Sequence, residues 1–218
     1  MKPADIKKNL KEVIDLLAHD LGPYLYHPDK DFTTNRKLYF KTVIEMIMGM
    51  GGGSLSKEIL EWFDYAEDTV SVSAFVQQRN KIKYEALNFI FKTMVNRCDK
   101  HLQFNGYRLF AVDGSDLRLS TNKTDAFSFI KNDEETKGYN LLHLDILYDL
   151  LQHIYIDASI QSKIGMKEHK ALVTMIDRSD ISDKMIIIAD RGYGSFNNIA
   201  HCQEKAGIIL FVQKNPTG

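Results

Sequence analysis

The spacing of apolar residues predicts helices in the first half of the chain. Residues 4–20 carry apolar side chains at helical intervals, and Gly22-Pro23 ends that helix. Further helices are predicted over residues 36–48, 57–65 and 71–100. We expect these helices to form one domain, residues 1–103.

The second half has the pattern of an α/β domain. Short apolar runs, several of them rich in β-branched residues, alternate there with two amphipathic stretches. The runs predict strands at residues 107–113, 141–148, 152–158, 185–189 and 207–212, and the stretches predict helices at 167–178 and 195–205. The fold class is therefore α/β: an N-terminal helical domain, then a mixed sheet in the order β-β-β-α-β-α-β over residues 104–218.

The composition is that of a folded protein. The hydrophobic fraction is 44%, the charged fraction is 26%, and four prolines occur among 218 residues. Cys98 and Cys202 belong to no CxxC pair, so neither a zinc site nor a disulfide framework is indicated, and we expect a cytoplasmic protein. No apolar run is long enough to cross a bilayer. These properties argue against disulfide-rich secreted proteins and membrane proteins.

Four glycines in five residues, Gly49 to Gly53, interrupt the helical pattern. Such a run can cradle a phosphate, but the Walker pattern requires Gly-Lys-Ser/Thr, and here Ser54-Leu55 follows Gly53. The other interpretation is a tight turn between packed helices, with Ser54 or Ser56 capping the next helix. We favour the turn.

The net charge of −1 conceals a basic segment. Residues 71–100 contain six basic side chains and two acidic ones, a local excess of +4. A solvated helix face would explain this excess. The alternative is contact with DNA phosphates, which binds DNA without reading its sequence. Under that alternative the DNA-contacting residues are Arg79, Lys81 and Lys83.

Two apolar strands end on an aspartate that a glycine follows closely. Asp113 precedes Gly114 and Asp190 precedes Arg191-Gly192, so we expect the backbone to turn sharply at both points. The first strand should lie in the middle of the sheet, and the fourth should return through a helix to pair parallel with it, which makes the two aspartates neighbours. Neighbouring carboxylates repel unless a cation lies between them, and such oxygen ligands favour Mg²⁺ or Mn²⁺. For either aspartate alone, a turn or helix cap is the competing interpretation.

Other ionisable residues have more ordinary explanations. Asp116 competes for the metal role, but we expect it past the Gly114 turn, facing solvent. His169, beside Glu168, is interpreted as a surface or core-edge residue of the crossover helix. Edge or turn roles are expected for the three aspartates of the meander, Asp145, Asp149 and Asp157.

The two aspartate motifs resemble those of a known enzyme family. Both are similar to the first and second carboxylate motifs of the IS-four family of insertion-sequence DDE transposases, and the element order resembles the ribonuclease-H-like fold. The Asp-Arg-Gly-Tyr match is the more specific, and the helical segment is also similar to that family. The motifs are Phe110-Ala111-Val112-Asp113-Gly114-Ser115 and Ile187-Ile188-Ala189-Asp190-Arg191-Gly192-Tyr193, and the helical segment contributes Ser54-Leu55 and Ser71-Val72-Ser73-Ala74-Phe75.

The resemblance implies a DNA transposase that cuts and joins phosphodiester bonds with two Mg²⁺ ions, for which Mn²⁺ can substitute. It implies that Asp113 bridges both ions and that Asp190 holds one. Arg191 would contact a phosphate or form a structural ion pair. The implied partners are double-stranded DNA, at the transposon ends and the target, and a second copy of the complete protein.

One part of the family pattern has no counterpart in this sequence. The third metal ligand of the family is a glutamate in a Tyr-x-x-Arg-x-x-x-Glu-x-x-x-x-x-x-Lys helix after the fifth strand, and Glu168 and Glu204 come too early to match it. We therefore expect an incomplete catalytic domain and a chain that is inactive alone. Two other functions stay open: a catalytically dead DNA-binding regulator of transposition, and a small metal-dependent nuclease.

Overall fold

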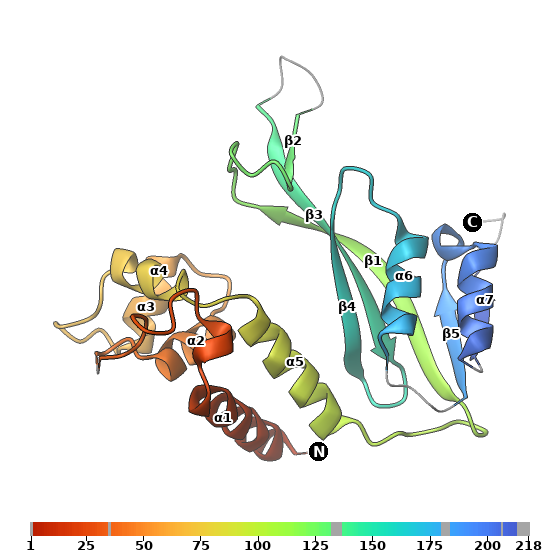
Figure 1. The fold of residues 1–218 in the computed structure, drawn as a ribbon, viewed down its shortest axis with the longest axis horizontal. Coiled ribbons are helices and arrows are strands. Elements are labelled where there is room, and N and C mark those ends of the chain that lie inside the picture. Colours follow the sequence, from red (N-terminus) through yellow and green to blue (C-terminus); the bar gives the residue numbers. More distant parts are fainter. Residues whose placement is uncertain (1, 35, 132–136, 180–183, 206, 213–218) are drawn as a thin grey trace. The chain divides into compact units, whose positions relative to one another are not determined.

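The computed structural model describes residues 2–34, 36–131, 137–179, 184–205 and 207–212 (Figure 1). The chain divides into two compact units, Met1–Cys98 and Asp99–Gly218. The division lies a few residues before the boundary at residue 103 that the sequence suggested. Among the described residues, no helix is both long enough and apolar enough to cross a membrane.

The first unit consists of helices packed around two apolar clusters. One cluster includes Val13 and Ile90 from the first and last helices, and the other includes Ile59 and Phe75 from two helices between them. The elements of the unit are α1 (Pro3–His19), the short 3-10 helix η1 (Gly22–Tyr24), α2 (Phe40–Gly49), α3 (Leu55–Trp62), α4 (Val72–Arg79) and α5 (Glu85–Cys98).

The glycine run forms a turn whose backbone donors bond to a side chain of the same unit. Glu58 accepts hydrogen bonds from the N–H groups of Gly51 (3.1 Å) and Gly53 (2.8 Å). These two bonds lower the pKa of the Glu58 carboxyl. Ser54 caps α3 by accepting a bond from the N–H of Lys57. Since a carboxylate already takes two of the donors that a phosphate would need, the loop is a structural turn.

The single helix predicted over residues 71–100 is wrong. Ser71 caps α4 as expected, but α4 and α5 are separate helices. In the segment between them, Ile82 forms an antiparallel bridge with Leu25 and packs against both apolar clusters. A continuous helix would remove Ile82 from these contacts, so tertiary packing overrides the local helix propensity here.

The second unit is a six-stranded mixed sheet with helices. Strand β1 lies between β3, which is antiparallel to it, and β5, which is parallel to it. Strand β4 pairs with β3, and β6 pairs with β5. A helical region followed by this sheet is the ribonuclease-H-like fold class that the sequence predicted. The elements are β1 (Arg108–Leu119), β2 (Phe129–Ile130), β3 (Tyr139–Asp149), β4 (Ile154–Ser162), α6 (Glu168–Asp177), β5 (Met185–Ala189), the 3-10 helix η2 (Arg191–Tyr193), α7 (Phe196–Glu204) and β6 (Gly207–Phe211).

Strands β1 and β3 extend further than predicted. Their ladder runs from the Phe110–Asp149 pair to the Leu119–Asn140 pair. The sharp turn expected at Gly114 is therefore wrong, because β1 continues through it. The residues after Gly114 are largely polar and exposed, so they lack the apolar signal of a buried strand. Their pairing with β3 is what makes them a strand.

The helices cover one face of the sheet. Figure 1 shows α6 and α7 side by side over the strands. Burial alternates along β1 and β5, with Phe110, Val112 and Ile187 on the covered face. On the other face the edge strands expose large apolar side chains: Tyr155, Ile160, Ile208 and Leu210. The parallel strands are thus apolar on both faces, which is typical of strands that are buried on both sides.

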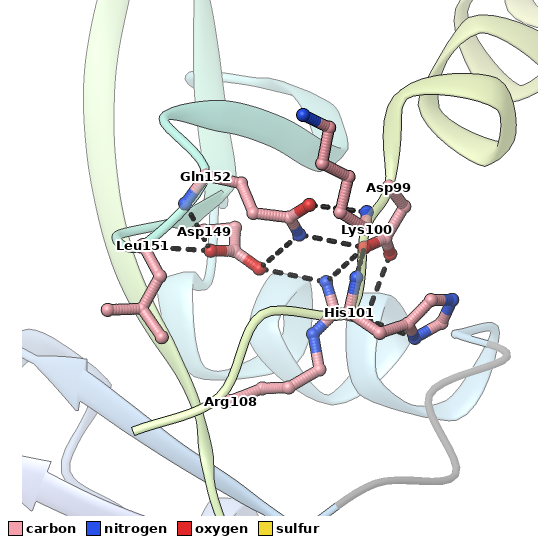
Figure 2. A network of polar contacts seen from close by, with 7 residues as sticks. All are labelled: Asp99, Lys100, His101, Arg108, Asp149, Leu151 and Gln152. Atoms are coloured by element: carbon pink, nitrogen blue, oxygen red, sulfur yellow. Dashed lines mark hydrogen bonds and ion pairs between the residues drawn. The ribbon is translucent and has the colours of Figure 1, made fainter. Parts of the chain in front are cut away.

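A buried arginine ties the start of β1 to the turn between β3 and β4 (Figure 2). The Arg108 side chain, 1% exposed, lies 2.8 Å from a carboxylate oxygen of Asp149 and 2.9 Å from one of Asp99. Gln152 donates hydrogen bonds to both carboxylates. Asp149 also accepts bonds from the N–H groups of Leu151 and Gln152. One guanidinium therefore joins three segments of the chain.

The Asp99 carboxyl shows how these contacts balance its burial. Desolvation raises its pKa, but hydrogen bonds from Gln152 and from the His101 N–H, together with Arg108, outweigh that effect. The pKa of Asp99 is therefore held below its ordinary value, and the charged form is the one that the fold stabilises.

We expect removal of the arginine to destabilise the sheet unit strongly. The substitution Arg108→Met leaves two buried carboxylates without their cation, a change that costs about 3–5 kcal/mol. The control is Lys57→Met in the exposed Lys57–Glu61 pair, which should cost less than about 1 kcal/mol. Urea unfolding, with hydrogen exchange of the β1 amides to identify the unit affected, measures both. Equal losses in the two variants would contradict the role given to Arg108.

Acid should loosen the same contacts. Because the pKa of Asp99 is lowered on folding from 3.8, its contribution is fully present above that value and is lost as the pH falls through the lower folded pKa. In Asp99→Asn this part of the pH dependence should be absent. Stability measured from pH 6 down to about pH 2 in both proteins tests the expectation, and parallel curves would refute it.

Candidate active site

Asp113 and Asp190 lie at the same level of two adjacent parallel strands. The last register pair of β1 and β5 is Ala111 with Ile188, and each aspartate comes two residues later on its own chain segment. Both aspartates are exposed. The strand arrangement from which their proximity was inferred is therefore present, and their role as metal ligands stays a prediction.

Local backbone donors orient each carboxylate. Asp113 accepts a hydrogen bond from the Gly114 N–H (2.9 Å). Asp190 is the N-cap of η2 and accepts one from the Gly192 N–H (2.8 Å). Each bond fixes one oxygen of its carboxylate against the backbone. Asp190 therefore caps η2, as the competing interpretation expected. Its second carboxylate oxygen is still available to bind a cation.

The carboxylates of Asp113 and Asp190 are the right kind of ligand for a hard divalent cation, but two side chains are too few to enclose one. Carboxylate oxygens are the ligands that Mg²⁺ and Mn²⁺ prefer. Within the described ranges, no three His, Cys, Asp or Glu side chains converge on a point that could hold a metal ion. Asp113 and Asp190 therefore offer two fitting ligands and not a closed site.

The carboxylate of Glu168 lies beside Asp190, although the sequence position of Glu168 gave no hint of this. Glu168 is in the first turn of α6. Its Oε2 and the Asp190 Oδ1 both lie within 3.0 Å of the point where a Cβ on Gly192 would stand. Gly192 is thus the residue that lets the two carboxylates approach each other. A crossover helix that packs on the sheet brings Glu168 here, and sequence spacing alone does not reveal it.

Asp116 is exposed to solvent, as expected, but it lies on strand β1 and not in a loop, so the cap role is wrong. It lies on β1, 2.8 Å from the His143 Nδ1 and 2.8 Å from the Lys163 ammonium. The hydrogen bond with His143 and then that from Lys163 lower the pKa of the Asp116 carboxyl. One polar group therefore combines Asp116 of β1, His143 of β3 and Lys163, the residue after β4.

A buried carboxylate, that of Asp145, lies next to this group. Asp145, fully buried, accepts bonds from the Tyr193 hydroxyl (2.8 Å) and the Gln161 amide (2.9 Å). Burial, and then the bond to Asp145, raise the pKa of Tyr193 above its ordinary value. The edge or turn role expected for Asp145 is wrong, because it lies on the helix-covered face of β3. Asp149 and Asp157 are also buried, and pair with Arg108 and Arg178 respectively.

His143 connects the two carboxylate groups. Its Nε2 lies 3.5 Å from Asp145 and 3.8 Å from Glu168, and it makes no hydrogen bond within the described part of the structure. The ring rests against Gly114, where a Cβ would stand 2.6 Å from Nε2. His143 was missed at the level of sequence. The signal was a pair of polar residues, His143 and Asp145, at alternate positions in the apolar central part of β3.

The sequence of this sheet unit matches a known family. A family model described as "Transposase DDE domain" matches residues 104–217. The chain belongs to the transposase DDE domain family.

Other comparisons add little to this result. No curated protein sequence matches the chain. Among solved structures, the "Mos1 transposase paired-end complex with left transposon end" matches with a TM-score of 0.31 and 8% identity, over 92% of this chain and 76% of that one. A likeness this loose does not bear on the function of the transposase DDE domain protein described here.

The residues predicted to contact DNA do not form one helix face. Arg79 is exposed at the end of α4. Lys81 forms an ion pair with Asp31 (3.7 Å) and lies over the Phe32 ring, while Lys83 donates to the Pro23 carbonyl (3.3 Å). Arg191, in the other unit, is exposed beside Asp190. His169 is exposed on α6, as expected.

The two site glycines should differ in their tolerance of a methyl group. In Gly114→Ala the new Cβ meets the buried His143 ring and the Tyr193 hydroxyl, and such overpacking costs about 1–3 kcal/mol. In Gly192→Ala the main obstacle is the end of the Glu168 side chain, which can rotate away, so the loss should be smaller. Urea unfolding of both variants tests the order, and a larger loss in Gly192→Ala would contradict it.

Proposed function

We propose that this chain is the DNA transposase of an insertion sequence, acting on phosphodiester bonds in cut-and-paste transposition. The observation that carries the proposal is the placement of Asp113 and Asp190 at one level of the parallel strands β1 and β5. They lie within a sequence that matches the transposase DDE domain. Its substrate is double-stranded DNA, at the transposon ends and the target.

Asp113 and Asp190 would hold the divalent cation, Mg²⁺ or in its place Mn²⁺. A bound Mg²⁺ supplies charge neutralisation at the phosphate and lowers the pKa of a coordinated water or hydroxyl. The contribution of the chain is to hold two carboxylates at one level of adjacent strands, Asp113 oriented by the Gly114 N–H within β1 and Asp190 by the Gly192 N–H of η2. Arg191, exposed next to Asp190, would contact a DNA phosphate as a charged hydrogen-bond donor.

The chain by itself would bind DNA without cutting it. In-line displacement with two metal ions needs a ligand set that closes around both ions. Asp113 and Asp190 are two such ligands, and the described residues offer no group of three that converge. A DNA-binding regulator of transposition without catalysis is the second candidate. We also propose that the complete enzyme acts together with a second copy of itself, as a homodimer.

Metal binding should depend on the two strand-end aspartates. We expect Mn²⁺ affinity, measured by isothermal titration calorimetry, to fall at least about 10-fold in Asp113→Asn and in Asp190→Asn, since removing a ligand costs more than disturbing the residues behind it. Asp125→Asn is the matched control, because Asp125 is a half-buried carboxylate of the same unit that accepts a hydrogen bond from Ser128 instead. Equal affinities in all four proteins would refute the assignment of the metal site.

The purified chain should bind DNA in EDTA and leave it uncut in Mg²⁺ or Mn²⁺. Binding is measured by fluorescence anisotropy of a labelled duplex, and cleavage by nicking of supercoiled plasmid. Absence of DNA binding would refute the transposase proposal. Nicking that disappears in Asp113→Asn would refute the claim of inactivity and favour a small nuclease. If that nicking also disappeared in Glu168→Gln, then Glu168 would be the carboxylate that completes the site.

A further inference from the structure

The segment between α4 and α5 borders a groove on the helical unit. The groove encloses about 580 Å³. Its apolar wall includes Ile47, Ile82 and Leu87, and its polar residues are Arg79, Asn80 and Lys83. Two tyrosines, Tyr26 and Tyr84, complete it. No carboxylate is among the residues that line it.

The two tyrosines are unusually accessible. Tyr84 is 75% exposed and Tyr26 is 58% exposed. Neighbouring backbone hydrogen bonds, from the Tyr26 N–H to the Lys81 carbonyl (3.1 Å) and from the Lys83 N–H to the Tyr24 carbonyl (2.9 Å), fix the segments that carry them. Exposed aromatic rings on a fixed backbone beside an apolar wall are typical of an interaction surface. They lose little conformational entropy when a flat partner stacks on them.

Basic side chains lie on both sides of this segment. Arg79 and Lys83 belong to the groove, and a second, smaller cavity is lined by Lys30, Arg36 and Lys81. Of the carboxylates near these cations, Asp31 is buried and paired with Lys81, and Asp29 and Glu85 are exposed, so the five basic side chains outnumber the acidic ones. The surroundings of the groove are therefore positive, which suits a polyanion.

We propose that this groove binds an unpaired segment of DNA, with bases stacked on Tyr26 and Tyr84 and phosphates held by Arg79 and Lys83. Aromatic rings beside cations bind single strands through base stacking and phosphate contacts. A duplex cannot use the rings in this way, because its base faces are covered by neighbouring base pairs. The inference rests on the proposed function, in which DNA strands are opened and exchanged, and it names a DNA site separate from the carboxylates of the sheet unit.

The test compares single-stranded and duplex DNA on the same protein. A fluorescein-labelled oligo(dT) and a duplex of equal length are titrated with the full chain at several salt concentrations. We expect Tyr84→Ala to weaken oligo(dT) binding by about 10-fold or more, as loss of one stacked base predicts, and to leave duplex binding unchanged. Tyr84→Phe keeps the ring and should bind like the unaltered chain. Tyr155→Ala, which removes another exposed ring, 54% accessible and in the sheet unit, is the control for loss of any exposed tyrosine.

The outcomes separate this inference from the proposed function. Duplex binding without oligo(dT) binding, or oligo(dT) binding that survives Tyr84→Ala and Tyr26→Ala, overturns the inference and leaves the transposase proposal intact. Equal weakening of both DNA forms by Tyr84→Ala also overturns it. If the chain binds no DNA of either form, both the inference and the transposase proposal are refuted. In Arg79→Ala the salt dependence of oligo(dT) binding should become shallower by about one phosphate contact, and an unchanged slope would remove Arg79 from the site.

Discussion

The sheet unit depends on the pairing of one buried guanidinium with two carboxylates. Arg108 is the first residue of β1, Asp149 is the last of β3, and Asp99 lies in the segment that leads into β1. A buried charge without its partners is far more costly than any alternative packing, so only a register that reunites all three is tolerated. The Gln152 amide donates hydrogen bonds to both carboxylates, so it further limits the strand registers that preserve these contacts.

This pairing specifies the position of the candidate site although it is not part of it. Strand β1 is central, with an antiparallel neighbour on one side and a parallel one on the other. A shift of β1 by one residue would move every side chain to the opposite face. Arg108 would then leave its carboxylates, and Asp113 would turn from the open face to the helix-covered one. The ion pairs at the start of β1 thus help to determine which face of the sheet carries Asp113, the proposed metal ligand.

Sequence reasoning succeeded where the signal was apolar and local. The apolar run before Asp190 gave β5 its bounds, and the order of strands placed β1 in the centre. It failed where polar residues form structure through distant partners. The exposed end of β1 has no apolar pattern of its own, and Asp116 belongs to a strand only because β3 pairs with it. Ile82 breaks a helix because two cores, formed by residues far from it in the chain, both contact it. The approach of Glu168 to Asp190 likewise follows from helix packing.

The order of pairing in the sheet has a consequence for how the protein is made. Strands β1, β3 and β4 follow one another closely, and their hairpins can close as soon as they leave the ribosome. Strand β5 pairs with β1 across a much longer stretch, with Phe110 meeting Ile187, and such long-range pairing is slow. Until β5 arrives, the backbone N–H and C=O groups on that side of β1 are unpaired and can pair with strands of other chains. Asp113 and Asp190 come to the same level of the sheet only when β5 pairs with β1, so a nascent chain would bring the two aspartates together late, after β1, β3 and β4 have formed.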